Sequence, residues 1–248
     1  YEIIAGKWGY ITSCNNEYIN SSSNVTVTLS EGYYDDFTFD FGWTVSGGIT
    51  PSDPGRWERG LPEATDYQGM NFNPGNDVNT DCFEYSFVTG LASAGSAGGN
   101  DVDDDNTILE SPTFSLLNNQ NHYLEYYSWF SNGGGSWGGG STPNDSLKVM
   151  ISNGNTTVTL EVMTASSNDM GQWNFRSFNV SQFIPVTSTM KLIIETADWD
   201  SQGGHLVEAG FDKFQISSTQ STSVIDNDQL SSRNLVKILR KIVTTKEG

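Results

Sequence analysis

Basic residues are scarce in this sequence of 248 residues, which has 12 Lys and Arg against 30 Asp and Glu and a formal net charge of −18. So large an acidic excess repels the phosphates of nucleic acids, and we therefore expect no nucleic-acid partner. Long apolar runs are also lacking. No stretch approaches the roughly 20 residues that a membrane-spanning helix needs, so we expect no membrane span.

Cysteine and histidine are equally rare, with two of each. Cys14 and Cys82 are too few for a disulfide framework, and the sequence leaves open whether they pair with each other. The histidines begin two similar motifs, HYLE (122–125) and HLVE (205–208), and His with Glu is a donor set of catalytic zinc sites. Both motifs lie in strand-like runs, where residues three apart point to opposite faces, so we expect them not to share a zinc ion.

Short strand-like runs are what the sequence has in abundance. At least eight occur between about residues 33 and 217, among them DDFTFDFGW, TILESPTFSL, DSLKVMISNG and MKLIIETADW. Each is apolar or alternating and ends at Gly, Asn, Pro or Ser. The abundance of Gly, Asn, Ser and Thr disfavours helices. The sequence therefore predicts an all-β fold, an antiparallel β-sandwich of the jelly-roll type.

Patterning divides the chain into three segments. Residues 1–30 read as a few leading strands, residues 31–217 as the sandwich, and residues 218–248 as a polar linker followed by the basic tail RNLVKILRKIVTTKEG. We expect this tail to dock on the acidic body rather than on a membrane surface. Because the sequence opens at Tyr1 inside a strand-like run, we expect it to be processed or excised from a longer protein.

The stretch GNDVDDDNT, residues 99–107, is the strongest chemical signal. Asp101, Asp103 and Asp105 have the alternate spacing with which a loop directs several carboxylates at one Ca²⁺ ion. Asn106 stands where an EF-hand loop needs Gly, so the stretch is not an EF-hand. We expect a structural calcium loop between strands, and the alternative is a solvated acidic turn.

Three tryptophans near turns or strand ends are the candidates for ligand binding: Trp57, Trp137 and Trp199. Exposed aromatic faces stack on sugar rings or on partner side chains. Trp137 lies in SNGGGSWGGGSTPND, a Gly-rich loop of the kind that carries binding in β-sandwiches. The alternative for each tryptophan is a position in the core.

Several motifs, taken in order over about residues 30–216, resemble the C-terminal β-sandwich of secreted zinc carboxypeptidases from Bacteroidetes-type bacteria. They are GYYDDFTFDFGWTVSG, GRWERGLPEAT, GSAGGNDVDDDNTILESPTFSL, YYSWFSN, NDSLKVMISNG and HLVEAGFDKFQI. The resemblance implies a MAM-like or concanavalin-like jelly roll that is secreted or at the cell surface. It also implies a structural cation held by Asp40, the loop 101–105 and Asp212, and a peptidase domain upstream in the same polypeptide.

The two ends of the chain carry weaker resemblances. YEIIAGKWGYIT resembles the last strands of a carboxypeptidase regulatory-like sandwich. SSRNLVKIL resembles the start of the C-terminal sorting domain used in type IX secretion, and RKIVTTKEG departs from that pattern.

Our first hypothesis is a non-catalytic, calcium-stabilised extracellular accessory domain that acts in binding, targeting or stabilisation, with a polysaccharide or protein ligand. The alternative is a carbohydrate-binding module that stacks sugars on exposed tryptophans. A second alternative is a stand-alone hydrolase that uses zinc at His122 and His205, or carboxylates that the sequence does not single out. The sequence contains no phosphate-binding loop, and we expect no enzyme activity from this chain.

Overall fold

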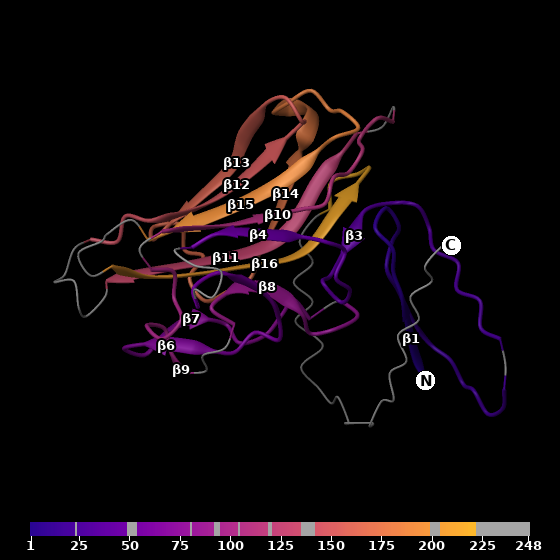
Figure 1. Ribbon diagram of the computed structural model, residues 1–248, viewed down its shortest axis with the longest axis horizontal. Coiled ribbons are helices and arrows are strands. Elements are labelled where there is room, and N and C mark those ends of the chain that lie inside the picture. Colours follow the sequence, from indigo (N-terminus) through magenta and orange to yellow (C-terminus); the bar gives the residue numbers. More distant parts are fainter. Residues whose placement is uncertain are drawn as a thin grey trace.

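The chain forms two antiparallel sheets that lie one over the other (Figure 1). The computed structural model describes residues 1–22, 24–48, 54–79, 81–91, 95–103, 105–118, 121–134, 142–198 and 204–221. Within these ranges the helical structure is a single short 3-10 turn, η1 (Val180–Gln182). The prediction of an all-β, antiparallel β-sandwich is confirmed. No described helix is long and apolar enough to cross a membrane.

The first sheet has five strands. Their order across the sheet is β13 (Thr157–Thr164), β12 (Ser146–Ser152), β15 (Lys191–Ala197), β10 (Asn106–Glu110) and β4 (Thr44–Gly47). Alternation in β12 shows why this segment is a strand. Leu147, Val149 and Ile151 are fully buried, whereas the residues between them are half-buried.

The second sheet has six strands, and its two longest strands, β11 (Tyr123–Gly134) and β16 (His205–Ser217), pair with each other along their lengths. The order across this sheet is β14 (Asn174–Asn179), β11, β16, β8 (Ser86–Thr89) and β5 (Trp57–Gly60), with β3 (Tyr34–Asp35) also paired to β16. From β10 onward the chain passes back and forth between the two sheets, as in a jelly roll, except that β12 and β13 form a hairpin within the first sheet. The inner faces of both sheets enclose one core, to which Leu109, Tyr126 and Phe211 contribute.

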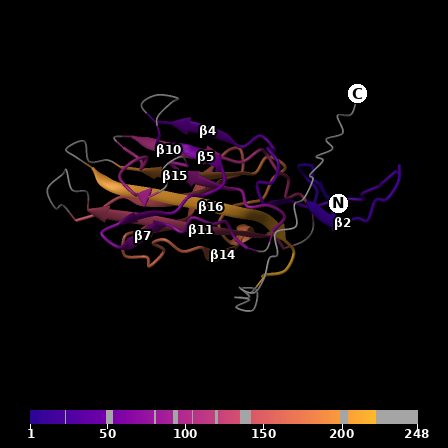
Figure 2. The ribbon, with the colours of Figure 1, turned by 90° about the horizontal axis from the view of Figure 1, so that it is seen from below.

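Two small sheets flank the sandwich. The first consists of β7 (Met70–Asn73), β6 (Thr65–Tyr67) and β9 (Gly95–Ser96). The second is a hairpin of β1 (Glu2–Ala5) and β2 (Ser13–Asn16), which lies beyond one end of the sandwich, to the right in Figures 1 and 2. Trp8, between the hairpin strands, stacks on Phe214 of β16 with ring centroids 5.7 Å apart. The predicted divisions at residues 30 and 218 stay predictions.

Candidate functional site

Two aspartates of one loop and a third that is distant in the sequence converge beside the six-stranded sheet. Asp77 and Asp81 lie in the loop between β7 and β8, and Asp212 lies in β16. One carboxylate oxygen from each lies within 4.8 Å of those of the other two. Asp77 and Asp212 are buried and Asp81 is half-buried. We call these three residues the aspartate cluster.

Asp212 reaches the cluster because β16 is bulged at this point. Phe211 and Phe214 both lie in the core, although residues three apart in a regular strand point to opposite faces. The pairing register with β11 shifts here, and Lys213 has a φ of 52°. The bulge places Asp212 on the outer face, where its Oδ2 accepts a hydrogen bond of 3.1 Å from the amide of Val78.

The loop that carries Asp77 and Asp81 is fixed at its end by two further links. The amide of Cys82 donates a hydrogen bond of 3.2 Å to Oδ2 of Asp36, which is fully buried. Cys82 also forms a disulfide with Cys14 of β2, which answers the pairing question that the sequence left open. The loop is therefore joined covalently to the N-terminal hairpin.

The electrostatics of the cluster favour protons or a cation. Burial is the largest cause that raises the pKa of Asp81 and of Asp212, and the charges of Asp36 and Asp77 raise both further. Burial also raises the pKa of neighbouring Asp35 to about 7, although hydrogen bonds from an amide and from an indole oppose the rise. At neutral pH the ionised forms of these carboxylates destabilise the fold unless a positive charge compensates them.

The donor set fits Ca²⁺. Oδ2 of Asp81 is buried and has no hydrogen-bond partner among the described residues, a state that is unfavourable for a carboxylate oxygen facing only protein. All three donors are carboxylates, and Ca²⁺ takes about six to eight oxygen ligands from carboxylates, carbonyls and water. A bound Ca²⁺ would satisfy the orphaned oxygen and offset the repulsion.

Of the five aspartates predicted to bind the cation, only Asp212 is in this cluster. Among the described residues, neither group with metal-binding geometry contains the other four: Asp40, Asp101, Asp103 and Asp105. The exposed Asp40 instead accepts a hydrogen bond of 3.0 Å from the amide of Gly42, and Asp105 accepts one of 2.7 Å from the amide of Asn106. The predicted common site is therefore corrected. Asp104 lies outside the described residues.

Asp101 lies beside a different part of β16 from the part that carries Asp212. Burial, followed by the charges of Asp103 and Glu208, raises the pKa of Asp101 to about 8. Asp101 therefore lies near Glu208, which precedes Asp212 by four residues, or about 13 Å along a strand. Asp77 and Asp81 belong to the 74–82 loop, in which Gly-Asn-Asp at 75–77 repeats the letters of 99–101. That repeat was the available signal for them.

Trp57 is a core residue, so its predicted role as a stacking platform is wrong. Its side chain is 2 % exposed, and its ring packs in the main core. A buried face cannot stack on a sugar. Its place at the start of β5 suggested exposure, but β5 pairs with the fully buried strand β8. Trp137 and Trp199 lie outside the described residues, and their roles stay predictions.

The two His-x-x-Glu motifs do not share an ion. His122 precedes β11 and His205 begins β16, and these antiparallel strands place the start of one beside the end of the other. The two imidazoles therefore lie at opposite ends of the ladder. Glu125 accepts hydrogen bonds from Gln215 and neighbouring residues, and Glu208 accepts one from Thr65. The separation therefore comes from the places of the two histidines along the ladder, and the opposite strand faces expected from the sequence are not what separates them.

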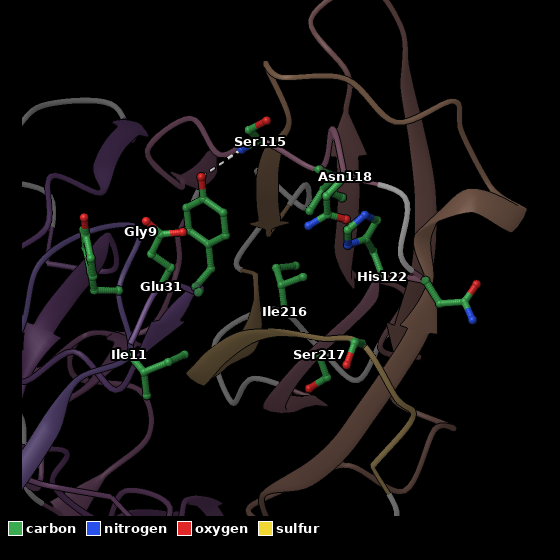
Figure 3. Close-up of a pocket in the computed structure, with 14 residues that line it drawn as sticks. Gly9, Ile11, Glu31, Ser115, Asn118, His122, Ile216 and Ser217 are labelled. Atoms are coloured by element: carbon green, nitrogen blue, oxygen red, sulfur yellow. Dashed lines mark hydrogen bonds between the residues drawn. The ribbon is translucent and has the colours of Figure 1, made fainter. Parts of the chain in front are cut away.

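A cavity of about 550 Å³ lies at the end of the sandwich where β11 begins and β16 ends (Figure 3). Segments 9–11 and 31–33 line one side. The other side is lined by residues 216–218 together with Ser115, Leu116, Asn118, Asn121 and His122. The hydroxyl of Tyr33 accepts a hydrogen bond of 3.0 Å from the amide of Ser115. His122 is 5 % exposed, and its Nε2 has no hydrogen-bond partner among the described residues.

Comparisons with known proteins find similar folds at low identity. No protein-family model and no curated protein matches the sequence. The K1 cleaved adhesin domain of Lys-gingipain from Porphyromonas gingivalis has a TM-score of 0.45 and 15 % identity, with 77 % of this chain and 100 % of that chain covered. A structure of carbohydrate-binding modules from the β-sandwich superfamily has a TM-score of 0.40 and 10 % identity, with coverages of 84 % and 67 %. A xylan-binding domain from CBM 22 has a TM-score of 0.37 and 14 % identity, with coverages of 77 % and 96 %. Likenesses this weak do not define a family.

Proposed function

We propose that this chain is a non-catalytic accessory domain whose β-sandwich is stabilised by Ca²⁺ at Asp77, Asp81 and Asp212. The observation that carries this proposal is the convergence of three carboxylates from the 74–82 loop and the last strand, beside the buried Asp36. Coordination would replace repulsion between these groups. The binding free energy of the ion would then add to the stability of the fold.

We also propose that the domain works outside the cell, downstream of a zinc carboxypeptidase unit in the same polypeptide and exported by type IX secretion. The sequence resemblance to secreted carboxypeptidases motivates the parentage. The Cys14–Cys82 disulfide supports export, because such bonds persist in oxidising compartments.

Thermal unfolding of the chelated protein during a Ca²⁺ titration tests the cation. At a free concentration 100 times the Kd, Ca²⁺ should add about 2.7 kcal/mol to the free energy of unfolding. Asp212→Asn should abolish this gain. Asp40→Asn is the matched control, because Asp40 is exposed and outside the cluster, and it should retain the full gain. A wild-type melting temperature that does not change as Ca²⁺ is added would refute the proposal.

A measurement in chelator separates lost coordination from general damage. Without Ca²⁺, Asp212→Asn removes one of several repelling buried carboxylates. We therefore expect this variant to be at least as stable as the wild type in chelator and less stable in Ca²⁺. A variant that is less stable by the same amount under both conditions would contradict the role of Asp212 as a ligand.

A second candidate function is the binding of a neutral saccharide in the cavity of Figure 3. Its wall combines the aromatic rings of Tyr10 and Tyr33 with hydroxyl and amide side chains such as Asn118 and Asn121. Apolar ring faces and neutral hydrogen-bonding groups are what a sugar engages. The net charge of −18 disfavours an anionic ligand.

Affinity electrophoresis through gels that contain neutral polysaccharides tests this candidate. We expect retardation by at least one glycan, with an affinity about tenfold lower in Asn118→Ala, which corresponds to about 1.4 kcal/mol. Asn155→Ala changes an exposed asparagine that does not line the cavity and should bind as the wild type does. If no neutral glycan retards the folded wild-type chain, the cavity is not a saccharide site.

A further inference from the structure

A second group of metal-ligand side chains meets at the opposite end of β16 from the cavity. Ligand atoms of Asp145, Asp198 and His205 all lie within 4.8 Å of one another. The three residues are 2 %, 0 % and 2 % exposed. His205 is seven residues from Asp212 in β16, or about 23 Å along a strand, so this group is separate from the aspartate cluster.

The group joins the two sheets. Asp145 immediately precedes β12 and Asp198 immediately follows β15, which are neighbouring strands of the five-stranded sheet. His205 is the first residue of β16 in the six-stranded sheet. Strand ends from both layers therefore bring their side chains to one buried point.

Neighbouring residues orient the donor atoms. Nδ1 of His205 lies 2.7 Å from Oδ2 of Asp145. Asn132 of β11 holds Asp145 twice, because its Nδ2 donates to Oδ2 at 3.2 Å and its Oδ1 accepts from the Asp145 amide at 3.2 Å. Gly204 makes room for the third donor, since a Cβ at this position would lie 2.0 Å from Oδ2 of Asp198. The backbone is thus shaped to bring Asp198 beside the imidazole.

We propose that Asp145, Asp198 and His205 bind a structural Zn²⁺ ion that ties the two sheets together. A hydrogen bond between Asp145 and His205 would by itself explain a buried pair. The second buried carboxylate, Asp198, completes a set of three ligand atoms that lie within 4.8 Å of one another, which one divalent cation could bind together.

The donor types select the metal. Ca²⁺ and Mg²⁺ prefer oxygen ligands, whereas one imidazole nitrogen with two carboxylates suits Zn²⁺. Two carboxylates also match the double charge of the ion. Asn132 would act as the outer partner that fixes the direction of a ligating carboxylate.

Imidazole NMR of the full chain tests the proposal, because the sequence contains only two histidines. Metal-stripped protein in excess Ca²⁺ is titrated with Zn²⁺, so that oxygen-only sites are already filled. We expect one equivalent of Zn²⁺ to shift the resonances of His205 and to leave those of His122 unchanged. Absence of a shift at His205, or a shift at His122 alone, overturns the proposal.

Variants give the second measurement. Asp198→Asn keeps the side-chain shape and removes one charge, and it should weaken Zn²⁺ binding at least tenfold in equilibrium dialysis. His122→Gln should bind Zn²⁺ as the wild type does. Asp212→Asn should lose the Ca²⁺ response and keep Zn²⁺ binding. The Ca²⁺ and Zn²⁺ proposals can therefore fail independently of each other. Zn²⁺ binding that is unchanged in folded Asp198→Asn overturns the assignment.

Discussion

Trp57 illustrates how much one side chain contributes to this core. Its ring is almost fully buried under β5, so truncation would leave a large cavity. We expect Trp57→Ala to lower the free energy of unfolding by about 3–5 kcal/mol in urea denaturation. Trp57→Phe, which keeps an aromatic ring, should lose clearly less. A loss below about 1 kcal/mol for the alanine variant would mean that the ring is not packed as described.

Lys213 stores backbone strain at the bulge that positions Asp212. Its φ of 52° is unfavourable for β-branched residues and harmless for Gly. We expect Lys213→Ile to be less stable than Lys213→Gly by about 1–2 kcal/mol in chemical denaturation. Both variants lose the ammonium that lies 5.8 Å from the centre of the Tyr127 ring, so the loss of this contact does not contribute to their difference. Equal stabilities would argue against the positive φ.

At the scale of elements, the Cys14–Cys82 bridge holds the hairpin β1–β2 to the loop of the aspartate cluster. The two cysteines are 68 residues apart, and closing so long a loop restricts the unfolded chain. We expect Cys82→Ser to lower the free energy of unfolding by about 4 kcal/mol in the chain-entropy account. Cys14→Ser should lose the same amount and the double variant no more. A double variant with twice the loss would show that each cysteine acts separately.

The alternation of apolar and polar residues predicted the strands. The composition of the aspartate cluster depends on pairing between strands that are far apart in the sequence, which local patterns do not give. The alternation of Leu147, Val149 and Ile151 is visible in the sequence and appears in β12 as expected. Two loops share the letters Gly-Asn-Asp, at 75–77 and 99–101, and their spacing does not tell which one meets the last strand. That choice depends on the pairing of β8 with β16 and on the bulge at Lys213. The prediction chose the loop around 99–101 because it contains more aspartates. In the structure, the loop around 75–77 is the one that meets Asp212.

For the whole molecule, buried carboxylates make the stability of the metal-free protein depend on pH. Burial raises the pKa of Asp35 and of Glu208 to about 7, above the values of unfolded carboxyl groups. The folded chain therefore holds more protons than the unfolded chain between about pH 4 and pH 7, and its stability falls as pH rises through this window.

We expect the melting temperature in chelator to decline from about pH 5 to pH 8. High salt should preserve this decline, because salt screens surface repulsion more than it screens buried groups. In Ca²⁺ the decline should be smaller, since deprotonated carboxylates bind the ion more tightly as pH rises. A melting temperature in chelator that climbs steadily over this range would contradict the raised pKa values.

The bridge between Cys14 and Cys82 also determines how the domain would respond to proteases. One peptide bond cut anywhere between these residues leaves two fragments that remain a single covalent species. The nicked chain would migrate as one band in non-reducing electrophoresis and as two after reduction. Asp36, Asp77 and Asp81 all lie inside the closed stretch, so a nick between them would not detach any of them from the body. The disulfide to the N-terminal hairpin thus keeps the domain in one covalent piece after a single proteolytic cut between Cys14 and Cys82.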